Sequence, residues 1–405
     1  MNKSLSALIG LFLLAAPSNA QDLDKIKQAE AKVQEIIFDS EELGQKRQVI
    51  IQTPQRYDID EMAYYNVIYV FDAQDRPLFD YTTGLANLIN PSNRNFIVVG
   101  IKATFIEEDM YGRNHDLLPA GTNVNLGPKS DGNAERFLAF VKNEVVPYVE
   151  SNYKTLPHNI AVGHSLSASF LIYAMLNETD LFDNYIAISP NLAYDEQYLV
   201  SELRHFDSGQ FTKPTYFYMS HADEDRGWPN WGDANEAAYP LLRETLANEN
   251  FIVEIEEYPE ETHRTTIVPS LNTAMQTVLE SVLPVQNTLL SDETYQITIR
   301  LELPNKGEEI FIAGNQESLA NWETGQMKMD AVSPYEREIT LEVQDPVEIQ
   351  FYRGQQDTPA WVAFNGGGRS NFPIILRPEE GTTYTYQLAG DSQYSSSNNS
   401  KSSNN

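Results

Sequence analysis

The sequence predicts an α/β fold, in which helices cover a mostly parallel sheet, followed by a small all-β sandwich. Continuous apolar, β-branched runs are typical of strands buried on both faces of a parallel sheet. Three such runs occur, at 66–71, 96–101 and 185–188. Helical patterns lie between them, for example at 134–150 and 167–176, so strand and helix alternate. Beyond residue 293 the helical patterns stop and short alternating strands follow.

The first 20 residues predict a secretory signal peptide. They begin with a basic Lys3, continue through an apolar run at 5–16 and end in Ser18-Asn19-Ala20. The apolar run is shorter than the ~20 residues that span a bilayer. We therefore expect cleavage after Ala20 and a secreted or periplasmic protein.

The rest of the chain divides by pattern. Residues 21–284 are expected to form the α/β domain, and β-rich runs at 33–38 and 48–52 predict a hairpin at the edge of its sheet. After a linker, residues 293–390 are expected to form an immunoglobulin-like sandwich. The Ser/Asn-rich tail at 391–405 is expected to be disordered.

Composition excludes several classes of function. The formal net charge is −30, which disfavours nucleic acid and anionic membranes as partners, because both bind clustered Lys and Arg. The chain has no cysteine, so disulfides, thiolate metal sites and a cysteine nucleophile are excluded. No histidine spacing typical of a metal site and no Gly-rich phosphate loop is found. We therefore expect no metal and no cofactor.

The most informative motif is Gly163-His164-Ser165-Leu166-Ser167, which follows a strand-like run at 159–162 and precedes a helical pattern. This is the context of a nucleophile elbow in the α/β-hydrolase fold. The serine sits on a sharp, strained turn, and small residues two positions before and after it prevent clashes. Ser165 is therefore the predicted nucleophile, with Ser167 in place of the usual second glycine.

The serine needs a base, and histidine is the usual one near neutral pH. In α/β-hydrolases the chain order is Ser, acid, His. His263 follows a strand-like run at 251–255 and precedes a helical pattern, which is where the base belongs. His164 is expected to point away from the site.

The acid is expected directly after the strand-like run at 215–220, where three adjacent carboxylates follow: Asp223, Glu224 and Asp225. The residues alone leave the choice among them open, and a Ser-His dyad beside a solvated acidic turn is the alternative.

Two main-chain amides are expected to hold the oxyanion. One is that of Leu166, because the helix after the serine points its N-terminal N–H groups at the developing charge. The other belongs to the loop after the strand at 66–71, at or near Ala73.

Residues from about 33 to 283 resemble the putative esterase family that includes enterobactin esterase, esterase D and feruloyl esterases. Four segments carry the resemblance: 37–44, 67–72, 98–101 with 113–119, and 163–165 with 189–191. It implies an α/β-hydrolase fold and ester hydrolysis. The family places its acid on a Gly-Asn-Glu-like turn, which implies Glu224 here. The family usually has glycine where this chain has Ala73.

Residues from about 293 to 390 resemble a starch-binding carbohydrate module, more loosely. The segments 310–315, 319–322, 335–339 and 349–354 carry this resemblance. It implies a sugar-stacking edge with Tyr335 and Trp361, whose alternative role is ordinary packing of the sandwich. In the first domain, Trp228 and Trp231 follow the acidic turn and are candidates to cap the substrate or simply to pack their loop.

Three functions remain open from the sequence. The first is an exported serine esterase acting on a carbohydrate-linked ester, of acetyl or feruloyl type, with a small-molecule or polysaccharide substrate. The second is a siderophore-type or general carboxylesterase whose β-domain is structural. The third is a non-catalytic carbohydrate-binding protein.

Overall fold

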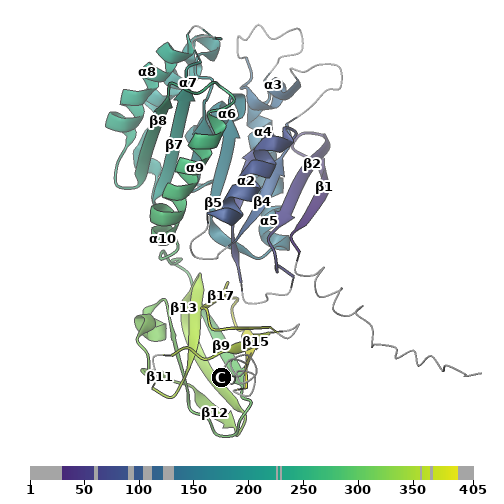
Figure 1. The fold of residues 1–405 in the computed structure, drawn as a ribbon, viewed down its shortest axis with the longest axis vertical. Coiled ribbons are helices and arrows are strands. Elements are labelled where there is room, and N and C mark those ends of the chain that lie inside the picture. Colours follow the sequence, from purple (N-terminus) through teal and green to yellow (C-terminus); the bar gives the residue numbers. More distant parts are fainter. Residues whose placement is uncertain are drawn as a thin grey trace, which may run out of the picture.

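The computed structural model describes residues 30–58, 63–89, 95–103, 112–121, 132–224, 227–228, 230–355, 358–364 and 368–390. The expected signal peptide and C-terminal tail lie outside these residues. The chain forms an α/β unit followed by a separate all-β unit (Figure 1). The predicted fold class, a mostly parallel sheet with helices plus a C-terminal β-sheet unit, is confirmed.

The α/β unit is built on an eight-stranded sheet in the order β1-β2-β4-β3-β5-β6-β7-β8. The strands are β1 (Lys32–Ser40), β2 (Gln45–Thr53), β3 (Tyr65–Phe71), β4 (Phe96–Ile101), β5 (Thr155–His164), β6 (Asn184–Ile188), β7 (Thr215–Ala222) and β8 (Phe251–Tyr258). The predicted hairpin is the antiparallel pair β1–β2 at the sheet edge. From β4 to β8 all neighbouring strands are parallel. All carboxyl ends of these strands therefore meet at one edge, where an α/β sheet carries its site.

Helices cover both faces of this sheet. One face carries α3 (Gly112–Leu117), α4 (Ala134–Phe140), α5 (Val146–Asn152), α6 (Leu166–Asn177), α7 (Tyr194–His205) and α8 (Trp231–Pro240). The other carries α2 (Arg76–Leu88), α9 (Ile267–Thr277) and α10 (Leu283–Gln286). Single π-helical turns extend α4, α8 and α9 at Val141–Val145, Leu241–Leu246 and Val278–Val282. Short 3₁₀ turns occur at Ser208–Gln210 and Glu317–Trp322.

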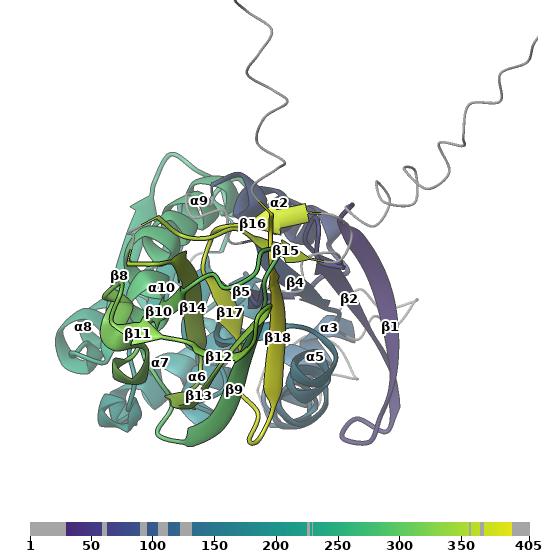
Figure 2. The same ribbon diagram turned by 90° about the horizontal axis from the view of Figure 1, so that it is seen from below.

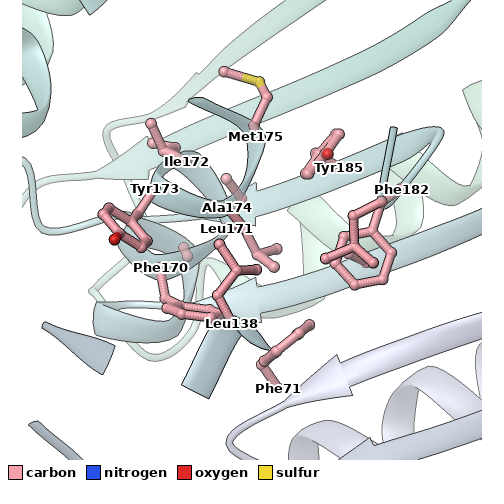
Figure 3. Packing of buried hydrophobic residues seen from close by; sticks show 14 of the residues in the cluster. Phe71, Leu138, Phe170, Leu171, Ile172, Tyr173, Ala174, Met175, Phe182 and Tyr185 are labelled. Carbon is pink, nitrogen blue, oxygen red and sulfur yellow. The ribbon is translucent and has the colours of Figure 1, made fainter. Parts of the chain in front are cut away.

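Aromatic packing fixes the central strands against α6 (Figure 3). Phe71, the last residue of β3, lies 5.4 Å from Phe170 of α6 and 6.0 Å from Phe182, measured between ring centroids. All three rings are fully buried. Phe71 immediately precedes the loop at 72–75, and Phe170 lies on the helix that follows Ser165. This packing therefore sets the distance between that loop and the start of α6.

The all-β unit contains two packed sheets. One has the order β11-β10-β14-β17 and the other β12-β13-β9-β18-β15-β16. Their strands are β9 (Thr294–Glu302), β10 (Ile310–Gly314), β11 (Met327–Lys328), β12 (Asp330–Ser333), β13 (Glu336–Gln344), β14 (Val347–Arg353), β15 (Val362–Phe364), β16 (Gly368–Ser370), β17 (Ile374–Leu376) and β18 (Thr383–Leu388). All pairs are antiparallel except β18 with β9. A core of its own holds the sheets together.

The all-β unit lies beyond one edge of the α/β unit (Figure 1) and in front of it in the view from below (Figure 2). Its contacts identify this edge as the one formed by the amino ends of the parallel strands. The Arg377 guanidinium donates to the carbonyl of Thr155, the first residue of β5, at 3.0 Å. Tyr64, just before β3, packs against the core of the all-β unit. The carboxyl ends of the parallel strands, and anything built on them, therefore face away from the second unit.

Candidate active site

The predicted nucleophile occupies a strained turn. Ser165 lies between the end of β5 and the start of α6, with φ 62° and ψ −124°. A non-glycine residue in this region is uncommon and costs energy, and such positions cluster at functional sites. The Ser165 amide donates to the carbonyl of Ile188 at 2.9 Å, which ties the turn to the end of β6.

Small residues flank the serine for a steric reason. A Cβ added to Gly163 would lie 2.7 Å from the carbonyl carbon of Ser167, closer than real Cβ atoms come. Ser167 is fully buried, and its hydroxyl accepts from the His164 amide at 3.0 Å and donates to the His164 carbonyl at 2.9 Å. Serine thus fits at position 167, where the family usually has glycine, and its two hydrogen bonds to the main chain of His164 stabilise the turn.

The predicted acid and base meet. Glu224 stands two residues beyond β7, and His263 lies in the loop between β8 and α9. Their Oε1 and Nδ1 atoms are 3.3 Å apart. Glu224 is 3% exposed, and its other oxygen accepts from the Ala222 amide at 3.0 Å. Burial alone would raise the pKa of Glu224, but its hydrogen bonds with the His263 ring and the Ala222 amide hold it below its ordinary value. The carboxylate is therefore ionised and able to stabilise a charged imidazole.

His164 does not point away from the site, which corrects the sequence-based expectation. Its ring lies 4.5 Å from that of His263, and its Nε2 donates to the His263 carbonyl at 2.7 Å. Burial, together with the neighbouring His263, lowers the pKa of His164 to about 4. His164 is thus neutral near pH 7 and holds the base's loop against the residue that precedes the nucleophile. No local sequence signal indicates this contact, because 99 residues separate its partners.

The other candidate acids and histidines have different surroundings. Asp223 donates its amide to the carbonyl of Glu261, and Asp225 lies outside the described residues. The ring of His221 hydrogen-bonds the hydroxyl of Tyr239. His158 pairs with Asp183 near the amino-end edge, and His205 bonds the Ser201 carbonyl within α7. Among the described carboxylates, Glu224 is the partner of His263.

The main-chain amide of Ala73, the residue at or near which the second oxyanion donor is expected, is already paired. The Ala73 amide donates to the carbonyl of Ile101 at 3.1 Å, because the ladder between β3 and β4 continues one step past the end of β3. The next amide, that of Gln74, has no hydrogen-bond partner among the described residues, and neither has the predicted Leu166 amide at the start of α6. Within the loop near Ala73, the main-chain amide of Gln74 is therefore the candidate for the second donor.

Alanine at position 73 fits without strain, although the family usually has glycine there. The left-handed residue of this loop is Asp72, with φ 60°, and aspartate tolerates that conformation better than most residues. The Ala73 methyl needs space instead, and Gly100 of β4 provides it. A Cβ at Gly100 would lie 2.7 Å from the Cβ of Ala73.

The two tryptophans predicted to bind substrate surround the base. Trp228 and Trp231 stack on each other with centroids 4.9 Å apart, and each lies 5.0 Å from the ring of His263. Trp231 is buried and packs the loop, whereas Trp228 is 47% exposed. The exposed indole is thus available to a substrate at the base, and the buried one supports it.

Tyr335 and Trp361 lie far from this site. Tyr335 accepts at its carbonyl from the amide of Leu303, just after β9, and Trp361 accepts from the amide of Ala389, just after β18. Because β9 and β18 are parallel neighbours, both rings belong to one end of the six-stranded sheet, opposite the end that meets the α/β unit. Tyr335 is exposed, whereas the Arg369 guanidinium lies 5.0 Å from the Trp361 ring.

The described part of the chain contains no cluster of three or more His, Asp or Glu side chains arranged to hold a metal ion. No described helix is both long and apolar enough to pass through a lipid bilayer.

The chain is similar to several known proteins. The family model described as "Putative esterase" matches residues 40–244, about half of the chain. A siderophore enterobactin esterase of Emericella nidulans is 25% identical over 185 residues, which cover 39% of this chain and 60% of the relative. The ferri-bacillibactin esterase BesA of Bacillus subtilis is 27% identical over 159 residues, covering 36% and 54%. The chain thus spans less than two thirds of the length of these relatives.

Solved structures show the same fold. An IroE-like serine hydrolase from Shewanella oneidensis superposes with a TM-score of 0.53 at 25% identity, covering 62% of this chain and 80% of the other. The siderophore hydrolase EstA from Aspergillus nidulans gives 0.51 at 19% identity, covering 67% and 99%. With the family model matched over the elbow and the acid-bearing strand, this chain belongs to the putative esterase family.

Proposed function

We propose that this chain is a serine esterase that hydrolyses carboxylic esters through an acyl-enzyme. The observation that carries the proposal is the arrangement of the elbow, the base and the acid. Ser165 lies on a strained turn, and the carbonyl of His263 accepts a hydrogen bond from His164, the residue before the serine. The carboxylate of the buried Glu224 lies 3.3 Å from Nδ1 of His263. These are the parts that serine acyl transfer requires.

The reaction follows from these parts. His263 takes the proton of Ser165 as its oxygen attacks the ester carbonyl, and Glu224 stabilises the charged imidazole. The Leu166 and Gln74 amides bind the oxyanion of the tetrahedral intermediate. His263 then gives its proton to the leaving alcohol, which leaves Ser165 acylated. Water attacks the acyl-enzyme with His263 again as base, releasing the acid and restoring the serine.

Labelling with a fluorophosphonate tests the nucleophile. We expect the wild-type protein to label and to hydrolyse short-chain p-nitrophenyl esters, and Ser165→Ala to do neither. Ser201→Ala is a matched control, because Ser201 is an exposed helix residue away from the site. Equal labelling or turnover by Ser165→Ala would contradict the proposal.

For the substrate, the relatives favour a siderophore-type ester, since those named above are siderophore esterases. The exposed face of Trp228 beside His263 suits a substrate with a flat, apolar group at the ester. A panel of siderophore esters against acetylated and feruloylated sugars decides this, and the proposal predicts the higher kcat/KM for the siderophores. Higher values for the sugar esters would favour the carbohydrate-linked alternative.

The all-β unit supports a second candidate function, binding of a polysaccharide. Tyr335 is 52% exposed at the far end of this unit, on the same edge as Trp361. Strands rise ~3.3 Å per residue, so the length of β3 is roughly 20 Å and that of β9 roughly 26 Å. Both lengths lie between the end of the all-β unit that carries Tyr335 and the edge of the α/β sheet that carries Ser165. Any sugar held there is therefore an anchor rather than the reacting ester. Co-sedimentation of the full chain with insoluble starch, lost in the double variant Tyr335→Ala/Trp361→Ala, is the expected result, and unchanged sedimentation would exclude this platform.

We further propose that the protein is exported, on the basis of the signal-like residues 1–20. Mass analysis of protein from the periplasm or medium is expected to give a chain that begins at Gln21. A chain retained in the cytoplasm with Met1 intact would contradict export.

A further inference from the structure

The loop between β3 and α2, residues 72–75, is held by a polar network centred on Asp72. This residue is 6% exposed and adopts a left-handed conformation. The guanidinium of Arg113 approaches both of its carboxylate oxygens, with Nε at 3.1 and 3.2 Å and Nη2 in closer contact. The carboxylate thus receives a two-pronged ion pair, the geometry that fixes orientation as well as charge.

The side chain of Gln74 is clamped at both of its polar atoms. Its Nε2 donates to Asp72 at 2.7 Å, and its Oε1 accepts from the amide of Ala103 at 3.0 Å. With both ends of the side chain fixed, the peptide plane that carries the Gln74 amide has little freedom. This main-chain N–H group, not the side-chain amide, is the proposed second donor to the oxyanion.

The helix that carries Arg113 is itself fixed to the sheet. It lies on α3, which carries Asp116 one turn later. Asp116 accepts two hydrogen bonds from Arg47 of β2, at 2.6 and 2.9 Å, and both side chains of this pair are almost completely buried. One ion pair therefore fixes α3 to the sheet, and the other fixes the 72–75 loop to α3.

The network also balances charge. Asp72 and Arg113 both lie close enough to act on the titration of His164, so they border the active site. An uncompensated carboxylate here would oppose the negative charge that develops on the substrate. Burial disfavours the charged form of Arg113, but Asp72 outweighs it and raises the pKa of Arg113 above its ordinary value. Arg113 therefore stays charged and compensates the carboxylate of Asp72.

We propose that Arg113 is a positioning residue for the oxyanion site, acting through Asp72 and the clamped side chain of Gln74 to aim the Gln74 amide at the substrate carbonyl. The inference rests on the proposed esterase function. It assigns Arg113 no contact with the substrate, so its loss affects the transition state more than ground-state binding.

The test compares Arg113→Met, which removes the charge, with Arg113→Lys, which keeps the charge but not the two-pronged contact. Loss of one oxyanion donor costs ~10²–10³ in kcat. We expect Arg113→Met to lose about 10²-fold in kcat on a p-nitrophenyl ester, with KM changed less than about threefold, since an oxyanion donor acts in the transition state. The kcat of Arg113→Lys is expected to lie between that of Arg113→Met and that of the wild type. In Arg113→Ala, added millimolar guanidinium is expected to restore part of the activity.

Arg76→Met is the matched control, because Arg76 follows the same loop but pairs with the exposed Asp80. It is expected to keep wild-type kcat. Should Arg113→Met fail to fold, Gln74→Ala, at a half-exposed position, is expected to show the same selective loss of kcat.

Three results would overturn the proposal: unchanged kcat in both Arg113→Met and Gln74→Ala, a loss confined to KM, or an equal loss in Arg76→Met. Absence of turnover and of fluorophosphonate labelling in the wild-type protein would instead show that the esterase assignment itself is wrong.

Discussion

Glu224→Gln isolates the charge of the acid, because glutamine keeps the shape of the side chain and loses only its ionisation. When the imidazole of His263 takes the serine proton, an ion pair forms with the carboxylate across 3.3 Å. At an effective dielectric constant of ~20, that pair contributes about 5 kcal/mol. This corresponds to roughly 10³–10⁴ in rate. We therefore expect kcat to fall by that factor in Glu224→Gln.

The assay is steady-state hydrolysis of p-nitrophenyl acetate, with thermal unfolding measured in parallel. KM is expected to change little, because the ion pair exists only after proton transfer begins. Asp223→Asn is the control, since this neighbouring carboxylate lies on the same turn, whereas the carboxylate bonded to His263 is that of Glu224. If Glu224→Gln keeps more than a tenth of the wild-type kcat, or if Asp223→Asn loses as much, the assignment of the acid is refuted.

Three further outcomes are expected. Gly163→Ala places a Cβ 2.7 Å from the main chain of Ser167, so it should lose activity and about 1–3 kcal/mol of unfolding free energy, measured in urea. Asp116→Asn leaves the buried charge of Arg47 unpaired and should cost about 3–5 kcal/mol in the same experiment. His164 titrates at about 4 in the folded chain, below its ordinary value, so the unfolded chain binds the proton first. Stability is thus complete above pH ~6.5 and falls by up to about 3 kcal/mol toward pH ~4; His164→Gln should flatten this loss in urea titrations across that range.

The elbow could be predicted because its determinants are local. Gly163, Ser165 and Ser167 lie within five residues, and the strand before them and the helix after them have clear patterns. The order of acid and base along the chain follows from the parallel topology, which brings successive loops to one edge. Family resemblance was needed to choose Glu224 among its neighbours, and the structure pairs it with His263.

The missed features depend on contacts that sequence patterns do not encode. Whether the main-chain amide of Ala73 or that of Gln74 is free depends on where the hydrogen bonds between β3 and β4 end. A shift of one residue in that end point changes which of the two amides is paired. The position of His164 depends on a carbonyl 99 residues away. Arg113 was part of the segment that carried the family resemblance, but its partner Asp72 is 41 residues distant. The end of the all-β unit at which Tyr335 and Trp361 lie follows from the pairing of β9 with β18, which joins segments far apart in the sequence.

The stacked indoles beside His263 give the protein an intrinsic optical reporter. The chain has four tryptophans, and two of them, Trp228 and Trp231, lie 5.0 Å from the ring of His263. Emission from an indole changes when a neighbouring ring gains charge or when a bound group displaces water from its face. After Trp322 and Trp361 are replaced by phenylalanine, the remaining tryptophan fluorescence would come from Trp228 and Trp231 alone. Stopped-flow emission would then follow acylation and deacylation on unlabelled esters, without a chromogenic leaving group.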